Sequence, residues 1–543
     1  MPKYIFVTGG VMSGLGKGVT TASIAKLLQL ASFKVTCIKI DPYLNVDAGT
    51  MNPLIHGEVF VTDDGGETDM DIGTYERFLN QNLTSEHNIT AGQVYKRVIE
   101  EERKGTYLGR CVQIIPHVTD EIKRRIRTIA QKSSVDIVLV ECGGTVGDIE
   151  GLPFLEALRQ MRLEEGTSNT LFVHVTLAPI LEPVGEQKTK PTQHSVQELR
   201  RIGIQPDMII VRCKDYLSEE SKRKISLFTS VEYDGVISNP DVSIVYEVPQ
   251  ILEKEGALSY ICKKLQLNYK GIDWHDWNQF LNSFLNAKDE VKIAIVGKYV
   301  SLVDSYVSIN HALIHAATSQ GVRVRAEWID SEELEHKPEL LSILKDFHGI
   351  LVPGGFGKRG IEGKIMAANY AYLHSIPYLG LCLGFQLAVV AFARYVVNLI
   401  GANSTEFDPL TPHPVIDLLP EQKNVKEMGA TMRLGGHEIT IKEGTNAFKI
   451  YGKKIIRERH RHRYELNQAY LETLENAGMI FSAYSDGGKR AEILEVPRHP
   501  FYFATQYHPE FISRPNAPEP IFVKFIQAAV QRKVDIQQPI ALV

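Results

Sequence analysis

The order of hydrophobic and polar positions divides the first half of the chain into short apolar runs and longer amphipathic stretches. Runs of strand length lie at 4–8, 34–40, 136–141, 170–175 and 208–212, and helical patterns lie at 20–30, 117–131 and 153–164. Strands that alternate with helices favour a parallel sheet covered on both faces. We therefore expect an α/β fold.

A second α/β series begins after a stretch in which this pattern fades. Residues 268–290 mix aromatic and polar side chains, and further apolar runs follow at 291–296, 349–352, 378–381 and 502–506. We predict an amino-terminal domain at 1–267, a linker at 268–290, a carboxyl-terminal domain at 291–535 and a tail at 536–543. The two series carry different motifs, so the second is no repeat of the first.

Composition narrows the class of protein. The chain has 543 residues, of which 60 are basic and 65 acidic, and 44% are hydrophobic. This balance argues against a protein whose main task is to bind nucleic-acid backbone. The 6 cysteines form no CxxC pair, which is typical of a reducing compartment. The most apolar stretch, 379–393, is too short to span a bilayer. We expect a cytoplasmic protein that binds neither nucleic acid nor membranes.

A glycine-rich loop directly follows the first predicted strand. It begins at Gly9 and Gly10, contains Lys17 and leads into a helical pattern from Thr20. Glycines let successive backbone N–H groups surround phosphate oxygens, and a helix N-terminus adds partial positive charge. The loop therefore indicates nucleotide binding, although a plain strand-to-helix turn is the simpler alternative.

Magnesium would need carboxylates from outside this loop, because Gly18 stands where standard phosphate loops have a metal-binding hydroxyl. Asp71 and Glu141 are the candidates. Glu141 ends an apolar strand and precedes a glycine-rich segment, which places it at the usual ligand edge of a parallel sheet. Lys39 ends another predicted strand, and the proline-containing loop 188–194 carries two lysines that could hold a second polyphosphate.

The second half contains a candidate nucleophile. Cys382 lies between Gly380 and Gly384, after an apolar strand and before a helix, which is the layout of a nucleophile elbow. A helix N-terminus also favours the thiolate form. A buried structural cysteine is the alternative, but the flanking glycines argue against it.

The partners of this cysteine are predicted near the end of the chain. His508 and Glu510 lie two residues apart after a strand, so on extended backbone they share a face and Glu510 can orient His508 toward Cys382. The loop 353–357 is rich in glycine and could supply oxyanion-hole amides. The basic run 457–463 could be a nucleic-acid patch or a metal site, but substrate carboxylate binding or a solvated strand is favoured.

The two halves resemble known families. The second half resembles class I glutamine amidotransferases, which use Cys, His and Glu to release ammonia. The segments IFVTGG (5–10), KIDPY (39–43), HGEVFV (56–61), ECGGTVGDIE (141–150) and KTKPTQH (188–194) resemble the synthase domain of the CTP synthase family. The resemblance implies a phosphate-loop synthase domain followed by an amidotransferase domain, and ATP-dependent amination of UTP to CTP through a 4-phosphorylated UTP.

The resemblance also implies roles for individual residues. The catalytic set would be Cys382, His508 and Glu510, and magnesium would be held by Asp71 and Glu141. ATP contacts would come from Gly14, Leu15, Gly16, Lys17, Gly18, Val19, Asp71, Asp241 and Val242. The UTP/CTP site would use Ser13, Asp148, Ile149, Glu150, Lys188, Thr189, Lys190, Pro191, Thr192, Gln193 and Lys224. Glutamine would bind Gly355, Leu383, Gly384, Phe385, Gln386, Glu406 and Arg463.

The same resemblance implies GTP as activator, CTP as feedback inhibitor and a homodimer that assembles into a homotetramer. The region between Glu406 and Arg433, where the family is thought to bind GTP, appears short, so the GTP site is not placed. Two alternatives remain: a different amidotransferase ligase with a phosphate loop, such as a cobyrinic-acid amidase, and a non-catalytic partition-type ATPase. The segments 56–61 and 188–193 argue against the first, and the complete Cys, His and Glu set argues against the second.

Overall fold

The computed structural model describes residues 2–181, 185–298, 300, 303–419 and 431–537. The chain divides into two compact units, one made of residues 1–48 and 71–276 and the other of residues 49–70 and 277–543. Residues 538–543 of the predicted tail, and residues 420–430 of the region expected to serve GTP, fall outside the described residues. Each unit is considered by itself.

The first unit contains a parallel sheet, as the alternating pattern predicted. Its strand order is β11-β10-β7-β1-β6-β2-β5, and every neighbouring pair is parallel. The strands are β1 (Lys3–Gly9), β2 (Val35–Asp41), β5 (Asn88–Thr90), β6 (Ile137–Cys142), β7 (Thr170–Leu177), β10 (Met208–Cys213) and β11 (Val236–Pro240). Their carboxyl ends meet at one edge of the sheet, which is where ligands bind in folds of this kind.

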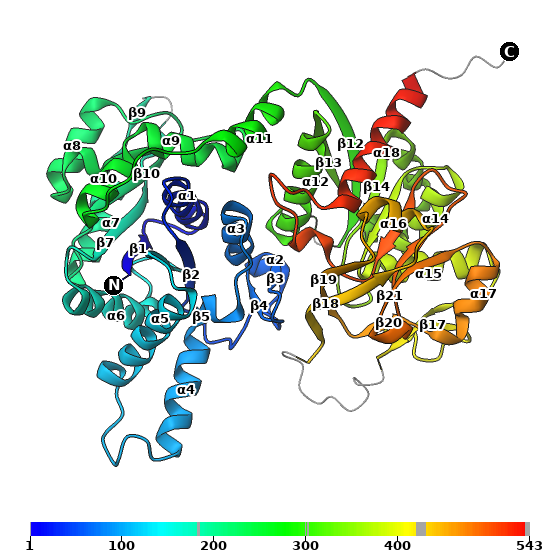
Figure 1. Cartoon of the computed structure of the whole chain (residues 1–543), viewed down its shortest axis with the longest axis horizontal. Coiled ribbons are helices and arrows are strands. Elements are labelled where there is room, and N and C mark those ends of the chain that lie inside the picture. Colours follow the sequence, from blue (N-terminus) through cyan, green and yellow to red (C-terminus); the bar gives the residue numbers. More distant parts are fainter. Residues whose placement is uncertain (1, 182–184, 299, 301–302, 420–430, 538–543) are drawn as a thin grey trace. The chain divides into compact units, whose positions relative to one another are not determined.

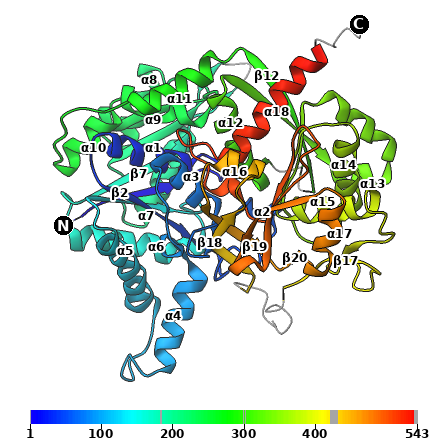
Figure 2. The same cartoon turned by 45° about the vertical axis from the view of Figure 1, so that its right-hand side comes forward.

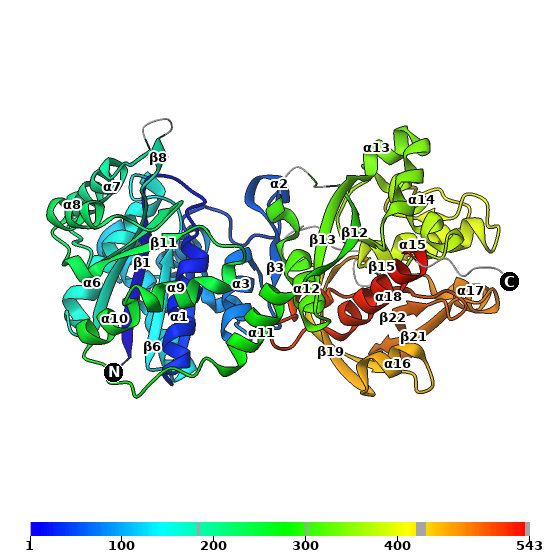
Figure 3. The ribbon, with the colours of Figure 1, turned by 90° about the horizontal axis from the view of Figure 1, so that it is seen from above.

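Helices cover both faces of this sheet (Figure 1). On one face Tyr4 and Phe6 pack with Ile122 of α5 and Leu155 of α6. Because side chains alternate along a strand, Ile5 and Val7 point to the other face, where α1, α9 and α10 lie together (Figure 3). The helices of this region are α1 (Lys17–Leu30), α3 (Met70–Leu79), α4 (Ala91–Arg103), α5 (Thr119–Ser133), α6 (Leu152–Glu165), α7 (Lys190–Arg201), α8 (Glu219–Thr229), α9 (Val248–Lys254) and α10 (Ala257–Leu265).

The second unit contains a mixed sheet with the order β13-β12-β14-β15-β23-β22-β21-β18-β19. Neighbours are parallel from β13 to β23 and antiparallel beyond it. The strands are β12 (Asp289–Gly297), β13 (Val322–Asp330), β14 (Gly349–Val352), β15 (Tyr378–Leu381), β18 (Arg433–Ile441), β19 (Ile455–His462), β21 (Ile480–Ser485), β22 (Arg490–Glu495) and β23 (Tyr502–Thr505). The described part of the molecule is therefore α/β in both units, as expected.

Helices cover both faces of the mixed sheet (Figure 2), and each face has its own hydrophobic core. Helices α14 (Ile361–Leu373) and α15 (Leu383–Tyr395) pack on one face, and α12 (Val307–Ser319), α16 (Asn446–Tyr451) and α18 (Pro520–Gln537) pack on the other. The shorter elements of this unit are α2 (Pro53–His56), β3 (Val59–Val61), β4 (Glu67–Asp69), α13 (Ser331–His336), β16 (Asn403–Ser404), β17 (Pro414–Leu418), β20 (Tyr464–Leu466) and α17 (Leu471–Asn476).

Two local expectations differ from the structure. The predicted linker contains the helix α11 (His275–Asn286), whose Trp277, Phe280 and Leu281 are buried. These positions follow helical spacing, so the mixture of aromatic and polar residues is an amphipathic helix. Only the start of the segment 188–194 is a loop, because α7 begins at Lys190 with Pro191 in its first turn. Proline is favoured there, since its missing N–H would be unpaired in any case.

Candidate functional site

The glycine-rich loop joins β1 to α1, as the sequence predicted. At two of its glycines neighbouring side chains leave no room for a Cβ. A Cβ on Gly10 would lie 1.6 Å from Ser195 Oγ, and one on Gly18 would lie 1.9 Å from Asp71 Oδ1. The Lys17 side chain crosses Gly9 and donates to the Gly144 carbonyl at 2.8 Å. The loop therefore brings the ends of β1 and β6 together with the Asp71 carboxylate.

Two carboxylates converge beside this loop. Lys39 at the end of β2 forms ion pairs with Asp71 and with Glu141, the latter at 3.0 Å, and Tyr75 donates to Glu141 from the other side. Burial raises the pKa of Glu141, and the Lys39 ammonium opposes that increase. Because one cation already bridges both carboxylates, the pair fits a divalent ion. In the described ranges no group of three or more metal-binding side chains surrounds such an ion, so phosphate and water would complete the shell.

The other residues predicted for the nucleotide site lie after the carboxyl ends of the parallel strands. Asp148, after β6, accepts from the Thr145 N–H at 2.6 Å and holds the turn before Ile149 and Glu150, both exposed. After β11, Asp241 pairs with Arg212 at 2.6 Å, and Val242 follows it. Ser13 and Gly14 are exposed in the loop, and Leu15 is buried.

The lysine-containing segment 188–193 follows β7 at the same edge. Lys188 pairs with Glu186 at 2.6 Å, and the Lys190 ammonium lies 5.5 Å from the Phe228 ring centroid. Thr189, Thr192 and Gln193 are buried at the start of α7, Pro191 is half-buried and Lys224 is exposed on α8. The parallel topology thus brings segments that are far apart in the sequence to one edge.

Cys382 occupies a sharp strand-to-helix turn between β15 and α15. Its φ of 51° lies in the left-handed region that side chains other than glycine rarely adopt. A Cβ on Gly384 would lie 2.1 Å from the Val352 carbonyl, and one on Gly380 would lie 2.7 Å from the Gly384 backbone. The turn can therefore form only between these two glycines, as the elbow motif predicted.

His508 and Glu510, the predicted partners of Cys382, line one cavity with it. Glu510 Oε1 lies 2.7 Å from His508 Nδ1, so the expected contact is present, although the backbone that makes it is a tight turn over Pro509–Phe511 and not an extended strand. Burial alone would lower the pKa of His508, but the Glu510 carboxylate and the Cys382 sulfur raise it to about 10. The site therefore favours an imidazolium beside Cys382, and an imidazolium can donate the proton that an amide leaving group needs.

A small cavity of about 70 Å³ opens onto Cys382 and His508. Gly354 and Gly355 line one wall, and Glu58 and Val59 line another. A Cβ on Gly354 would lie 3.1 Å from His508 Cε1 and 3.7 Å from Cys382 Cβ. The glycine loop 353–357 is thus in contact with both catalytic side chains, where oxyanion donors are needed.

Of the residues predicted to bind glutamine, Gly355 lines this cavity, whereas the others are not among its described lining residues. Leu383, Gly384, Phe385 and Gln386 are buried in the first turn of α15. Glu406 accepts from the Gly357 N–H at 3.2 Å, and burial raises its pKa. Arg463 donates to the Thr431 hydroxyl at 2.8 Å.

The basic run 457–463 has a structural role that the sequence did not reveal. On β19 the side chain of Arg457 pairs with Asp63 at 3.0 Å, Arg459 donates to the Val61 carbonyl at 3.0 Å and Arg461 pairs with Glu67 at 2.7 Å. The same strand contacts two of the predicted catalytic residues: His508 N donates to the Arg459 carbonyl at 2.8 Å, and Cys382 Sγ lies 3.6 Å from the Arg461 carbonyl. It therefore connects the segment 49–70 to the catalytic residues.

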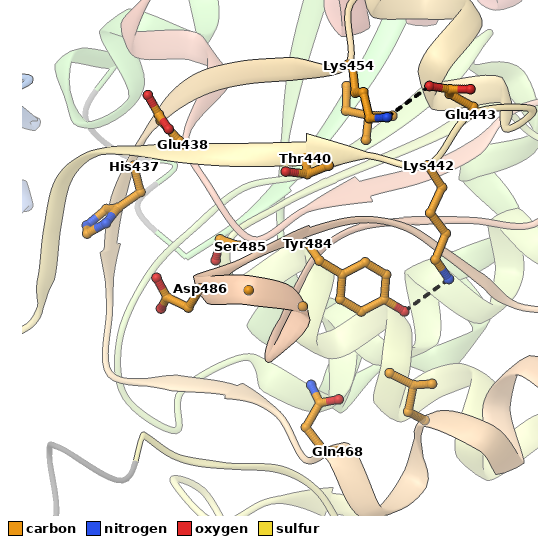
Figure 4. Close-up of a pocket in the computed structure, with 14 residues that line it drawn as sticks. His437, Glu438, Thr440, Lys442, Glu443, Lys454, Gln468, Tyr484, Ser485 and Asp486 are labelled. Atoms are coloured by element: carbon orange, nitrogen blue, oxygen red, sulfur yellow. Dashed lines mark hydrogen bonds and ion pairs between the residues drawn. The ribbon is translucent and has the colours of Figure 1, made fainter.

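A much larger hollow of about 1250 Å³ lies elsewhere on the second unit (Figure 4). Residues of β18, β21 and the following turn line it, and none of the catalytic set does so. Its charged groups compensate one another, as in the Lys454 to Glu443 pair at 3.1 Å. The volume of a cavity alone does not identify the reactive site here. The small cavity is the better candidate, because Cys382, His508 and Glu510 line it. Within the described ranges no helix has the length and apolar character needed to cross a membrane.

Comparisons with known proteins match both halves of the chain. The family model for the CTP synthase N-terminus matches residues 3–267, and the model for class-I glutamine amidotransferase matches residues 301–528. The chain is 57% identical to a CTP synthase of Thermococcus gammatolerans over 534 residues, which cover 98% of this chain and 99% of that protein. It is 57% identical over 529 residues to a CTP synthase of Archaeoglobus fulgidus, with 97% and 98% covered.

A solved structure, the glutaminase domain of Trypanosoma brucei CTPS with bound acivicin, is 42% identical and covers 44% of this chain and 94% of its own, with a TM-score of 0.42. Relatives that share more than half of their residues with this chain cover almost all of it, and the two family models match its two halves. These matches decide between the interpretations that the sequence left open. This chain belongs to the CTP synthase family.

Proposed function

We propose that the two units catalyse consecutive parts of one reaction, in which glutamine hydrolysis at Cys382 supplies ammonia for the ATP-dependent conversion of UTP to CTP. The observation that carries this proposal is the Cys382, His508 and Glu510 arrangement within a chain whose other unit bears the phosphate loop. A phosphate loop and an ammonia source belong together, because a ring carbonyl oxygen is a poor leaving group and phosphate is a good one.

In the glutaminase half, the Cys382 thiolate attacks the glutamine side-chain amide carbon. His508 then gives its proton to the leaving nitrogen, so that ammonia departs and a thioester forms. Water then attacks the thioester and gives a proton to His508, so that glutamate leaves and the thiolate and the imidazolium are restored. Glu510 keeps His508 oriented and protonated, and the amides of the loop 353–357 hold the oxyanion.

In the synthase half, the γ-phosphoryl group of ATP passes to O4 of UTP, and ammonia displaces phosphate from C4 to give CTP. Phosphoryl transfer needs mainly positioning and neutralisation of charge. Lys17 and Lys39 provide fixed cations, and Asp71 and Glu141 would hold Mg²⁺. When bound, that ion would neutralise phosphate charge. The residues Ser13, Asp148–Glu150 and 188–193 would contact the pyrimidine nucleotide.

Two variants test this division of labour. Cys382→Ala should abolish glutamine-dependent CTP formation while added ammonia still supports it, and the exposed Cys111→Ala serves as the matched control. Lys17→Ala should lose CTP formation from either nitrogen source, since its cation acts on phosphate, whereas the surface variant Lys34→Ala should not. A folded Cys382→Ala enzyme that makes CTP from glutamine at the normal rate would overturn the proposal.

A further inference from the structure

Two buried lysines contact the glycine loop beside Cys382, and neither belongs to the catalytic set. Lys364 on α14 is fully buried, and Lys298, directly after β12, is 4% exposed. Lys364 Nζ donates to the Pro353 carbonyl at 3.1 Å. Lys298 Nζ donates to the Phe356 carbonyl at 3.0 Å and also to the Gly357 carbonyl. The two lysine Nζ groups therefore bind the loop 353–357 at both of its ends.

These contacts fix the peptide planes that flank the centre of the loop. Each trans peptide is planar, and its C=O and N–H groups point in opposite directions. The Phe356 carbonyl and the Gly357 N–H belong to the same peptide. Because the carbonyl faces Lys298, the Gly357 N–H points to Glu406 and donates to it at 3.2 Å. With the Pro353 carbonyl on Lys364, the Gly354 N–H points away from that lysine.

Two peptide N–H groups lie between these anchors, those of Gly355 and Phe356. Among the described residues neither donates a backbone hydrogen bond, and both residues line the cavity that contains Cys382 and His508. Gly355 has a φ of 150°. Unpartnered N–H groups beside a nucleophile are what an oxyanion requires.

We propose that Lys298 and Lys364 are positioning residues of the glutaminase reaction, which hold the loop 353–357 so that the N–H groups of Gly355 and Phe356 remain available to the oxyanion. The proposal rests on the glutaminase chemistry proposed above. It adds two residues that act through the loop and do not touch the reacting atoms.

The protonation of Lys298 gives this role a pH dependence. Burial lowers the pKa of Lys298 to about 8; Glu406 and Glu335 oppose that decrease and Arg359 adds to it. Arg359 also donates to the Lys298 carbonyl at 2.9 Å, and burial together with Lys298 lowers the pKa of Lys364, the other lysine at the loop. As the pH rises through about 8, Lys298 loses its charge and its hold on the two carbonyls weakens. Glutamine hydrolysis should therefore decline over that range.

The test uses Lys298→Met, Lys298→Arg and Lys364→Met in the full-length enzyme, with Lys292→Met as control because Lys292 is exposed on the same strand. Lys298→Met should lower kcat for glutamine hydrolysis on the order of 10- to 100-fold, as expected for misplaced catalytic groups. Ammonia-dependent CTP formation should be unchanged. Alkylation of Cys382 by iodoacetamide needs no oxyanion hole, so its rate should stay within about twofold of the wild type, whereas a general collapse of the site would slow it.

Lys298→Arg keeps the proposal testable if the methionine variants fail to fold. Arginine does not titrate in this range, so this variant should retain activity and lose the decline near pH 8. An unchanged decline, or an unchanged kcat in Lys298→Met and Lys364→Met, would overturn the positioning role. Full glutamine hydrolysis by Cys382→Ala would instead overturn the proposed function, so the two failures are distinguishable.

Discussion

His508 is a residue whose protonation this site controls. Its pKa is raised from 6.5 to about 10 by Glu510 and Cys382, against the effect of burial. The folded protein therefore binds this proton more tightly than the unfolded chain. The resulting contribution to the free energy of unfolding is fully present below about pH 6.5 and is lost as the pH rises through about 10.

Replacement of Glu510 by glutamine tests this control. In Glu510→Gln the effect of burial should prevail, so the pKa of His508 should fall and the thiolate should lose its counter-ion at neutral pH. We expect glutamine hydrolysis to fall on the order of 100-fold and the pH profile of Cys382 alkylation to change. The exposed Glu438→Gln is the control. An alkylation profile that matches the wild type would contradict this account of His508.

At the scale of elements, the elbow depends on glycine for space. Gly384→Ala would place a Cβ 2.1 Å from the Val352 carbonyl, so β14 or α15 must move. We expect a loss of about 1–3 kcal/mol in the free energy of unfolding and a larger fractional loss of glutamine hydrolysis, measured by urea unfolding and by glutamate release. Gly271→Ala, with no atom within 4 Å of the added Cβ, should change neither quantity.

The arginines of β19 should differ in importance according to their burial. Arg461 pairs with Glu67, whose side chain is 1% exposed, whereas Arg457 pairs with Asp63 at 35% exposure. Arg461→Gln leaves a buried carboxylate uncompensated and should cost about 3–5 kcal/mol. Arg457→Gln should cost at most about 1 kcal/mol.

Urea unfolding and limited proteolysis within residues 49–70 measure this difference. Arg461→Gln combined with Glu67→Gln should recover part of the stability, because no buried charge then remains. Equal costs for the two single variants would show that burial does not decide their contribution.

At the scale of the whole molecule, we expect CTP to limit its own formation. UTP and CTP share a triphosphate and a ribose, so only the base distinguishes them, and the family resemblance places Glu150 near a separate cytosine pocket. Arg159 is expected in the same pocket. The simpler alternative is a surface ion pair between Glu150 and Arg159, but Arg159 pairs with Glu156 at 2.8 Å. Glu150→Ala should raise the inhibitory concentration of CTP far more than the KM for UTP in steady-state assays. Equal changes would indicate one shared base site.

The sequence by itself determined the features that depend on local order. The β1 loop, the elbow at Cys382 and the contact between His508 and Glu510 involve residues within a few positions of one another, where glycine spacing and strand ends restrict the backbone. The alternation of strands and helices predicted the parallel sheet for the same reason. The helix α11 was also encoded locally, by Trp277, Phe280 and Leu281 at helical spacing, but its polar residues obscured the pattern.

Only the tertiary structure decided which distant residues meet. Arg461 and Glu67 are 394 positions apart, and nothing in either neighbourhood indicates the other, so the basic run on β19 could not be interpreted from composition. Lys298 and Lys364 likewise gave no signal as isolated lysines in otherwise ordinary patterns. Their role arises because β12 and α14 bring two lysine Nζ groups to the carbonyls of one loop, where burial strengthens each contact and removes water as a competing donor.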